Sequence, residues 1–126
     1  MSIIHDFRDL RVYQKAFEMS DKIFEITKSF PKEEIYSMTD QIRRSSRSVG
    51  ANIAEAHRRR IYPKSLASKL NESEAEAAET QHCLDSAHKC KYIDNLTHDT
   101  FRKEYDNIIG MLVNMRRSSH KWDMEK

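Results

Sequence analysis

Glycine and proline are scarce in this sequence, which contains two of each in 126 residues. Tight turns between β-strands and the loops that bind phosphate groups both depend on glycine, so a chain with two glycines is poorly suited to either. Pro31 and Pro63 both fall at points where one stretch of helical periodicity ends and the next begins. The scarcity and the placement together predict an all-α chain with few connections.

Apolar residues recur at alternating spacings of three and four in four stretches, which is the pattern of a helix with one apolar face. Helices are therefore predicted over residues 7–29, 32–60, 63–92 and 98–118, followed by a frayed tail over 119–126. Asp6 and Thr97 are the predicted N-caps of the first and the last helix. Four long helices with short connections favour antiparallel neighbours. The predicted fold is an antiparallel up-and-down four-helix bundle that forms one domain over residues 1–126.

Small side chains are common in the second and third predicted helices. Examples are Ser45, Ser46, Gly50, Ser73 and Ala77. Small residues let two helices approach closely, so these two helices are expected to pack against each other. The alternative explanation is that alanine is simply a good helix former.

The N-terminal segment, MSIIHDFRDL, has no apolar stretch of signal-peptide length, and no window of the sequence approaches a membrane span. A cytoplasmic protein with no membrane partner is expected. Cys83 and Cys90 are seven residues apart in a predicted helix, which separates them by roughly 10 Å along its axis. That distance is too long for a disulfide, so both are predicted to be reduced thiols.

Six histidines raise the question of a metal site. The segment 79–82, Glu-Thr-Gln-His, has the Glu-x-x-His spacing with which ferritin-like bundles bind two metal ions. Those sites need a second such motif, and the sequence has none. His82 beside Cys83 and His88 near Cys90 do not converge on one ion, because they are spread along one helix. No metal or other cofactor is predicted.

Motifs of known catalytic sites are also missing from the sequence. It contains no Gly-x-Ser-x-Gly, no phosphate-binding loop and no His-Glu-x-x-His. Small all-α ribonucleases of the HEPN type have this size, and their signature is an arginine followed by four to six residues and a histidine. The nearest approach here is Arg116 to His120, with three residues between them. The protein is predicted not to be an enzyme, with a HEPN-type ribonuclease as the remote alternative.

Arginine is concentrated in the second predicted helix. Three arginines lie in its middle and three at its end: Arg43, Arg44, Arg47, Arg58, Arg59 and Arg60. Helical periodicity places Arg44, Arg47 and Arg58 opposite the apolar face, although Asp40 and Glu55 share that side. The third predicted helix is acidic in comparison. Because the net charge is only +2, a nucleic acid would have to be attracted by this local clustering or by charge multiplied through oligomerisation.

Three interpretations of this asymmetry stay open. The arginines form a solvated face, which is the usual fate of surface charge. Alternatively, they pack against the acidic helix of a neighbouring subunit, in a head-to-tail contact that closes into a ring. The third interpretation is phosphate binding through the bidentate guanidinium fork. The last two are compatible, because subunits assembled in parallel would gather the arginines that end the second helix into a ring of positive charge.

Three blocks of the sequence resemble a known family. They are Phe7-x-x-Leu10-x-Val12-Tyr13-Gln14-x-Ala16, Phe30-Pro31-x-Glu33 and Gln41-Ile42-Arg43-Arg44-Ser45-Ser46-x-Ser48-Val49-x-x-Asn52-Ile53-Ala54-Glu55. Together with the later Glu79-Thr80-Gln81 and Tyr92-Ile93, they are similar to the 23S rRNA intervening-sequence (S23-type) four-helix-bundle proteins. The resemblance spans nearly the whole chain. The sequence departs from it at Ala56, where the family usually has glycine, and at Ser73-Glu74, where a small-residue pair is common.

The resemblance implies a bacterial four-helix bundle that assembles as a ring-shaped homopentamer. It also implies kinship with the accessory protein of diversity-generating retroelements, a basic pentamer that binds nucleic acid and a reverse transcriptase. For most of the family the biochemical role is unknown.

The leading hypothesis is therefore a non-enzymatic homopentamer that binds RNA or DNA through a basic surface, with an accessory role to another protein as one form of this function. The predicted nucleic-acid-binding residues are Arg43, Arg44, Arg47, Arg58, Arg59 and Arg60. Gln41, Asn52 and Glu55 are predicted to bond within the bundle or between subunits, since buried polar groups need partners. The alternative function is a protein-binding scaffold without nucleic-acid contact.

Overall fold

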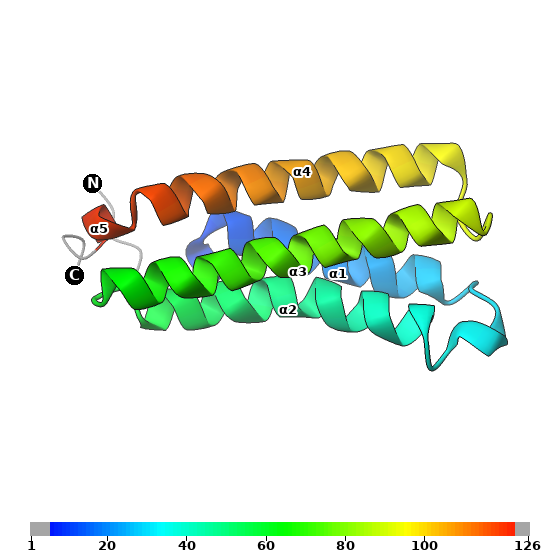
Figure 1. Ribbon diagram of the computed structural model, residues 1–126, viewed down its shortest axis with the longest axis horizontal. Coiled ribbons are helices and arrows are strands. Elements are labelled where there is room, and N and C mark those ends of the chain that lie inside the picture. The colour runs from blue at the N-terminus through cyan, green and yellow to red at the C-terminus, as the bar shows by residue number, and fades with distance from the viewer. Residues whose placement is uncertain (1–5, 123–126) are drawn as a thin grey trace.

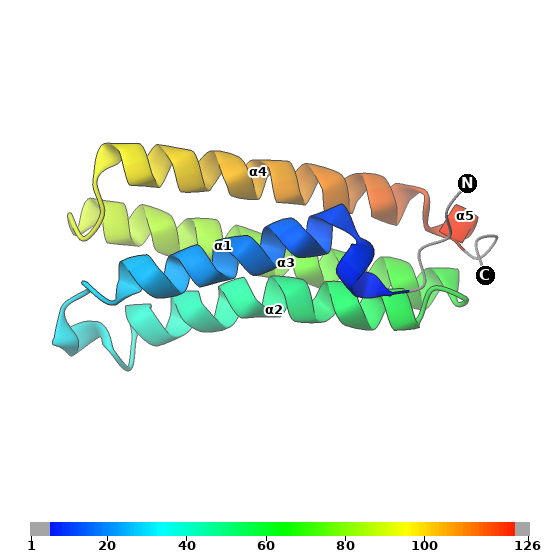
Figure 2. The same cartoon turned by 180° about the vertical axis from the view of Figure 1, so that it is seen from behind.

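The computed structural model of the protein describes residues 6–122, and over this range the chain forms helices and no strands (Figure 1). The four long helices are α1 (Arg11–Thr27), α2 (Met38–Arg58), α3 (Pro63–Lys89) and α4 (Asn95–Arg117). Three short helical segments accompany them: η1 (Phe7–Asp9), η2 (Lys32–Glu34) and α5 (Ser119–Trp122). Each long helix runs antiparallel to the one before it, as Figures 1 and 2 show from opposite sides. The fold is the up-and-down four-helix bundle that the sequence predicts.

The core lies between the four long helices and is built from their apolar faces. Fully buried side chains come from every helix: Ile23 of α1, Ile42 and Ile53 of α2, Leu70 and Leu84 of α3, Ile108 and Leu112 of α4. Removing a side chain of this size from water stabilises the fold by about 1.5–3 kcal/mol. Over the part of the chain that the structure describes, no helix combines the length and the apolar character that a membrane span requires.

Helices α2 and α3 pack through small side chains whose hydroxyl groups are buried. The hydroxyls of Ser45 and Thr80 share a hydrogen bond of 2.8 Å across the two helices. Ser73 donates to the carbonyl oxygen of Val49, also at 2.8 Å. Because these buried polar groups have partners, they fix the register of α2 against α3 without a large desolvation penalty.

The first long helix begins at Arg11, later than the predicted residue 7. Asp6 caps the short segment η1 instead of α1, and its carboxylate accepts the Arg8 backbone N–H at 2.8 Å. Leu10 then has extended backbone geometry, with φ −71° and ψ 126°. Its side chain is buried. The extended residue between the two helical segments allows Leu10 to enter the core.

The second long helix begins at Met38 instead of the predicted residue 32. The preceding turn is held by Glu34, whose carboxylate accepts hydrogen bonds from the Ser37 hydroxyl at 2.7 Å and the Tyr92 hydroxyl at 2.9 Å. Ser37 itself has φ −125° and ψ −99°, which is not helical. Glu34 therefore joins this turn to the α3–α4 connection, and its carboxylate also accepts the backbone N–H of Met38, the first residue of α2, at 3.4 Å.

The predicted N-cap of the last helix, Thr97, is wrong by three residues. Asp94 is the N-cap, and its carboxylate accepts the Thr97 backbone N–H at 2.8 Å. Helix α3 has already ended at Lys89, and Lys91 reverses the chain with a positive φ of 64°. In the predicted frayed tail, residues 119–122 form the short helix α5, and residues 123–126 lie outside the described range.

The two ends of the bundle differ in what they contain. One end holds the α2–α3 connection, the last turn of α4 and α5 (Figure 1). The opposite end holds η2 and the α3–α4 connection. The six predicted arginines therefore lie in two places. Arg43, Arg44 and Arg47 lie on the side of the bundle, along the middle of α2, whereas Arg58, Arg59 and Arg60 lie at the end that holds the α2–α3 connection.

Candidate nucleic-acid interface

Arg43 connects α1 and α2 within the bundle. Its Nε donates to the Thr27 hydroxyl at 2.8 Å, and its guanidinium lies 4.5 Å from the centre of the Phe24 ring. The side chain is half-buried. The hydrogen bond and the ring contact hold the guanidinium against α1, where an outside ligand reaches it less easily than an exposed arginine.

Arg44 and Arg47 are exposed on the middle of α2, but their surroundings differ. Arg44 forms an ion pair with Asp40, one helical turn away, at 3.0 Å. Arg47 forms no ion pair within residues 6–122, and its guanidinium lies 5.5 Å from the centre of the Phe24 ring. Of these two exposed arginines, Arg47 is therefore the one that no carboxylate of the described residues pairs with.

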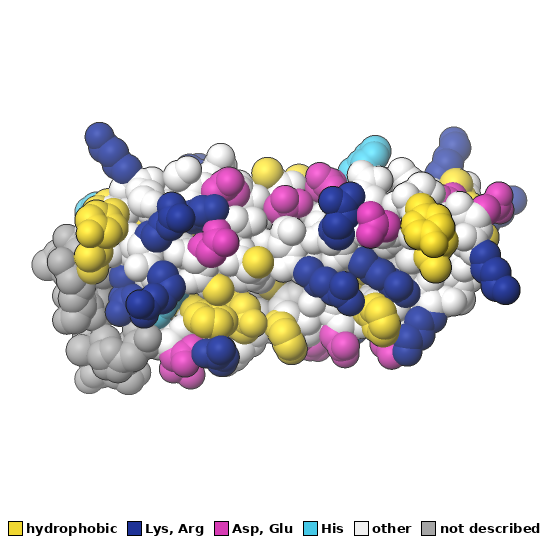
Figure 3. Space-filling model, turned by 90° about the horizontal axis from the view of Figure 1, so that it is seen from below, with side chains coloured by type: hydrophobic (Ala, Val, Ile, Leu, Met, Phe, Trp, Pro, Cys, Tyr) yellow, Lys and Arg dark blue, Asp and Glu magenta, His cyan; other side chains and the backbone are white. Residues whose placement is uncertain are grey.

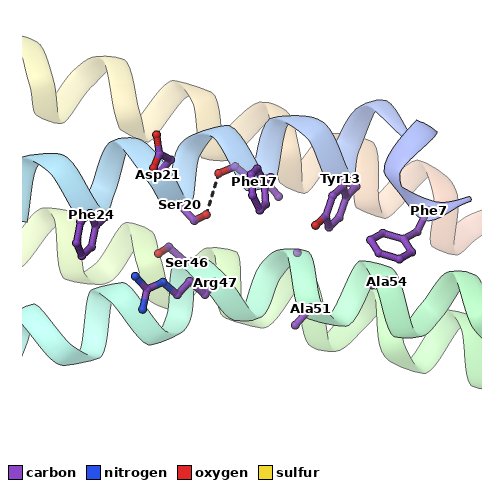
Figure 4. Close-up of a pocket in the computed structure, with 12 residues that line it drawn as sticks. Phe7, Tyr13, Phe17, Ser20, Asp21, Phe24, Ser46, Arg47, Ala51 and Ala54 are labelled. Atoms are coloured by element: carbon purple, nitrogen blue, oxygen red, sulfur yellow. Dashed lines mark hydrogen bonds between the residues drawn. The ribbon is translucent and has the colours of Figure 1, made fainter.

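Arg47 stands on the rim of an apolar groove between α1 and α2, which has a volume of about 590 Å³. Aromatic side chains of η1 and α1 form one wall: Phe7, Tyr13, Phe17 and Phe24 (Figure 4). The α2 wall is made of small residues, including Gly50, Ala51 and Ala54. Phe17 is 63% exposed although it belongs to this aromatic row. The sequence does not reveal this groove, because two helices form it together and periodicity describes one helix at a time.

The end of α2 carries three consecutive arginines, which we call the arginine tip: Arg58, Arg59 and Arg60. Arg58 is exposed, and no hydrogen bond or ion pair connects it to another described residue. Arg59 is also exposed, and it donates to the Ser65 hydroxyl at 3.3 Å. Arg60 donates to the carbonyl oxygen of His57 at 2.9 Å, which places its charge at the negative end of the helix dipole.

The arginine tip lies in a stretch of the sequence that has no acidic residue. Residues 56–71 contain five basic residues and no acidic one, although the net charge of the whole chain is only +2. In Figure 3, which looks onto the α2 side of the molecule, acidic and basic side chains alternate over most of the length. The positive charge at the tip is therefore local. Within residues 6–122 none of its three arginines forms an ion pair, although Arg59 lies near enough to Glu55 to help lower the pKa of that carboxyl.

The three polar residues predicted for an interface lie on α2 with partners from their own chain or with none. Asn52 is half-buried and donates to the Ser48 carbonyl at 2.9 Å. Glu55 accepts from Lys69 at 2.7 Å, and this hydrogen bond lowers the pKa of the Glu55 carboxyl. Gln41 is exposed, and its side chain makes no hydrogen bond to residues 6–122. Of the three, Gln41 has the side chain that is available to a neighbouring molecule.

The glutamates of α3 are not equally available. Glu74 forms an ion pair with Arg116 at 2.6 Å, which joins α3 to α4 and occupies the arginine considered for a ribonuclease motif. Glu72 pairs with Lys69 at 3.2 Å. Burial, with smaller contributions from Glu79 and Glu72, raises the pKa of Glu76. Glu79 is exposed and has no ion pair to the described residues.

Histidines and cysteines are dispersed over the structure. Within residues 6–122, no group of three or more His, Cys, Asp or Glu side chains is arranged to hold a metal ion. His88 and His98 stack with their ring centres 4.2 Å apart. Cys83 is buried, and this burial raises the pKa of its thiol to about 11, whereas Cys90 is exposed at the end of α3.

Comparisons with known proteins match both the sequence and the fold. The model of a family described as "23S rRNA-intervening sequence protein" matches residues 8–114. Among solved structures, the chain is similar to a protein of unknown function from the S23 ribosomal protein family of Bacteroides thetaiotaomicron. The two are 28% identical and superpose with a TM-score of 0.77, over 84% of this chain and 95% of the other. A comparison with curated proteins gives no match.

Proposed function

The chain belongs to the 23S rRNA-intervening sequence protein family, and from this starting point we propose that it is a non-enzymatic cytoplasmic homo-oligomer that binds RNA or DNA through the arginine tip. The observation that carries the proposal is the concentration, at one end of the bundle, of arginines that form no ion pair with the described residues. Arg58 and Arg59 are exposed there, and no acidic residue occurs between Glu55 and Glu72.

Guanidinium chemistry supports phosphate as the ligand of the tip. Arginine presents several N–H donors in a planar fork that matches two phosphate oxygens, and it stays charged at any physiological pH. The Arg59 bond to Ser65 and the Arg60 bond to the His57 carbonyl each use one donor nitrogen of the fork. These bonds restrict the side chains before a ligand arrives, which reduces the entropy lost on binding.

Oligomerisation would strengthen the attraction to a polyanion. Five copies of a chain with a net charge of +2 carry +10, and a parallel ring would bring their arginine tips to one rim. The occupant that we propose for the α1–α2 groove is a second copy of the chain. Charge complementarity supports this choice, because the positive Arg47 on the rim of the groove can pair with the negative Glu79 on the outer side of a neighbour's α3. A contact between two different surfaces is head-to-tail and can close into a ring.

The binding test compares two double variants that remove the same total charge. In Arg58→Ala/Arg59→Ala the arginine tip is removed. In Arg44→Ala/Arg102→Ala the lost arginines are ones that already pair with carboxylates, Asp40 for Arg44 and Asp99 and Asp106 for Arg102. Affinity for a fluorescently labelled mixed-sequence RNA is measured by fluorescence polarisation over a series of salt concentrations.

The tip variant is expected to bind roughly tenfold or more weakly at low salt, and the slope of log K against log salt should fall by roughly one to two. The RNA affinity and the salt slope of the Arg44→Ala/Arg102→Ala control should stay close to those of the wild type. Equal losses in both variants would mean that only total charge matters and would remove the tip from the proposal. If the wild type assembles but binds neither RNA nor DNA, the alternative function, a protein-binding scaffold, would be favoured.

A further inference from the structure

Two apolar side chains are exposed beside the arginine tip, in the connection between α2 and α3. Ile61 is 41% exposed and Tyr62 is 62% exposed. Such a connection is usually polar, because its side chains face water. The placement of an aromatic ring between a run of arginines and a proline therefore calls for an explanation beyond the turn itself.

The backbone of this connection is well fixed. The Tyr62 N–H donates to the carbonyl oxygen of Arg59 at 2.9 Å, and the Tyr62 carbonyl accepts the Leu66 N–H at 2.9 Å. Pro63, the first residue of α3, restricts the chain further. The Tyr62 ring, in contrast, has no ring or cation contact with the rest of residues 6–122. A rigid backbone thus carries an aromatic face that is free for a ligand.

We infer that Tyr62 is a stacking platform for an unpaired base, and that the arginine tip consequently prefers single-stranded to double-stranded nucleic acid. This inference rests on the proposed function, since it assumes that phosphates bind at Arg58 and Arg59. Single-strand-binding proteins combine basic side chains that follow the backbone with aromatic side chains on which bases stack. In a duplex, the base faces are already covered by their neighbours, so a duplex reaches the arginines but not the ring.

The opposite end of the bundle provides the contrast. Tyr36 is 94% exposed, more than Tyr62, but the residues that precede it include Glu33 and Glu34. Two carboxylates that lie two and three residues before the tyrosine disfavour phosphates in this segment, so an exposed aromatic side chain is not sufficient for this function. Tyr36 is therefore a matched control, because it has the same side chain at an exposed position without the arginines.

The experiment measures binding of a labelled single-stranded RNA and of a duplex of the same length by fluorescence polarisation. Tyr62→Ala is expected to weaken single-strand binding by about tenfold and to leave duplex binding unchanged. Tyr62→Phe should keep the wild-type preference, because it keeps the aromatic face. Tyr36→Ala should change neither affinity. Equal effects of Tyr62→Ala on both nucleic acids, or no effect on either, would overturn the inference.

A second measurement reports stacking directly. In a Trp122→Phe background, which removes the native indole, the fluorescence of Tyr62→Trp should be quenched by the single strand and not by the duplex, with Tyr36→Trp as the reference. Failure of the inference can be told from failure of the proposed function. If Arg58→Ala/Arg59→Ala loses RNA affinity while every Tyr62 variant behaves as the wild type, only the stacking role is wrong. If the wild type binds no nucleic acid, both proposals are wrong.

Discussion

Two tyrosines of the bundle have hydroxyl groups in opposite surroundings. The Tyr92 hydroxyl donates to the Glu34 carboxylate at 2.9 Å, and this hydrogen bond raises the pKa of Tyr92 to about 12. Tyr105 is fully buried on α4, and its hydroxyl has no hydrogen-bond partner within the described residues. Burial raises the pKa of Tyr105. An unpaired buried hydroxyl opposes folding, because it has lost its hydrogen bonds to water.

Replacing Tyr105 by phenylalanine should therefore stabilise the protein. Tyr105→Phe removes the unpaired hydroxyl and keeps the ring in the core, so the free energy of unfolding should rise by about 1 kcal/mol. Tyr92→Phe is the matched variant and should lower the free energy of unfolding, since the Glu34 carboxylate loses a hydrogen-bond donor. Urea denaturation at constant protein concentration measures both changes. A clear loss of stability in Tyr105→Phe would show that the buried hydroxyl does have a partner.

The candidate site could be predicted from the sequence in part. Periodicity assigns Arg43 and Arg47 to α2, but it cannot show that Arg43 bends toward Thr27 on α1 while Arg47 stays exposed. That difference depends on the path of a long side chain between two helices. Tyr62 is hard to identify for another reason. It lies beside Pro63, where helical periodicity ends, and the sequence signal is only an aromatic residue close to three arginines.

At the scale of elements, the four long helices and their order were predictable, because each has one apolar face over many turns. Their ends were not. Single hydrogen bonds set them, such as those of Glu34 with Ser37 and of Asp94 with the Thr97 N–H. The burial of Leu10 adds an extended residue before α1. Periodicity averages over several turns and does not resolve such local competition.

Gly110 allows a test of helix α4 as an element. It lies in the interior of the helix at an exposed position, and a Cβ added there would meet no atom within 4 Å. Gly110→Ala should raise the free energy of unfolding by roughly 0.5–1 kcal/mol, because alanine loses less backbone entropy in a helix. Thermal unfolding followed by circular dichroism measures the change. A loss of stability would instead indicate that another subunit packs closely against Gly110.

At the scale of the whole molecule, the resemblance seen in the sequence was the strongest predictor. Membership of the 23S rRNA-intervening sequence family and the four-helix bundle are both confirmed. The ring of five subunits and the kinship with retroelement accessory proteins stay predictions. Assembly depends on surfaces that periodicity classifies only as polar or apolar. The exposed Phe17 in the α1–α2 groove is the structural feature that makes assembly testable.

Light scattering after size-exclusion chromatography tests the assembly. The wild type should have a mass near five times the 14.9 kDa of one chain. Phe17→Glu should reduce it to that of a single chain, because it introduces a charge into an apolar contact. Leu96→Glu is the control, since Leu96 is 75% exposed at the other end of the bundle. A monomeric wild type would refute the ring, and a Phe17→Glu variant that still assembles would move the contact to another surface.

The positions of the two cysteines have a practical consequence for spectroscopy. The thiol of Cys90 is exposed, whereas Cys83 is buried with a raised pKa of about 11, so maleimide dyes will attach at one position of the native protein. Cys90 follows the last turn of α3, and the arginine tip adjoins its first turn. A helix of 27 residues separates them by about 40 Å. The wild-type chain therefore carries a ready attachment point for a donor fluorophore, at a distance where energy transfer to a labelled RNA reports on which end of the bundle the RNA occupies.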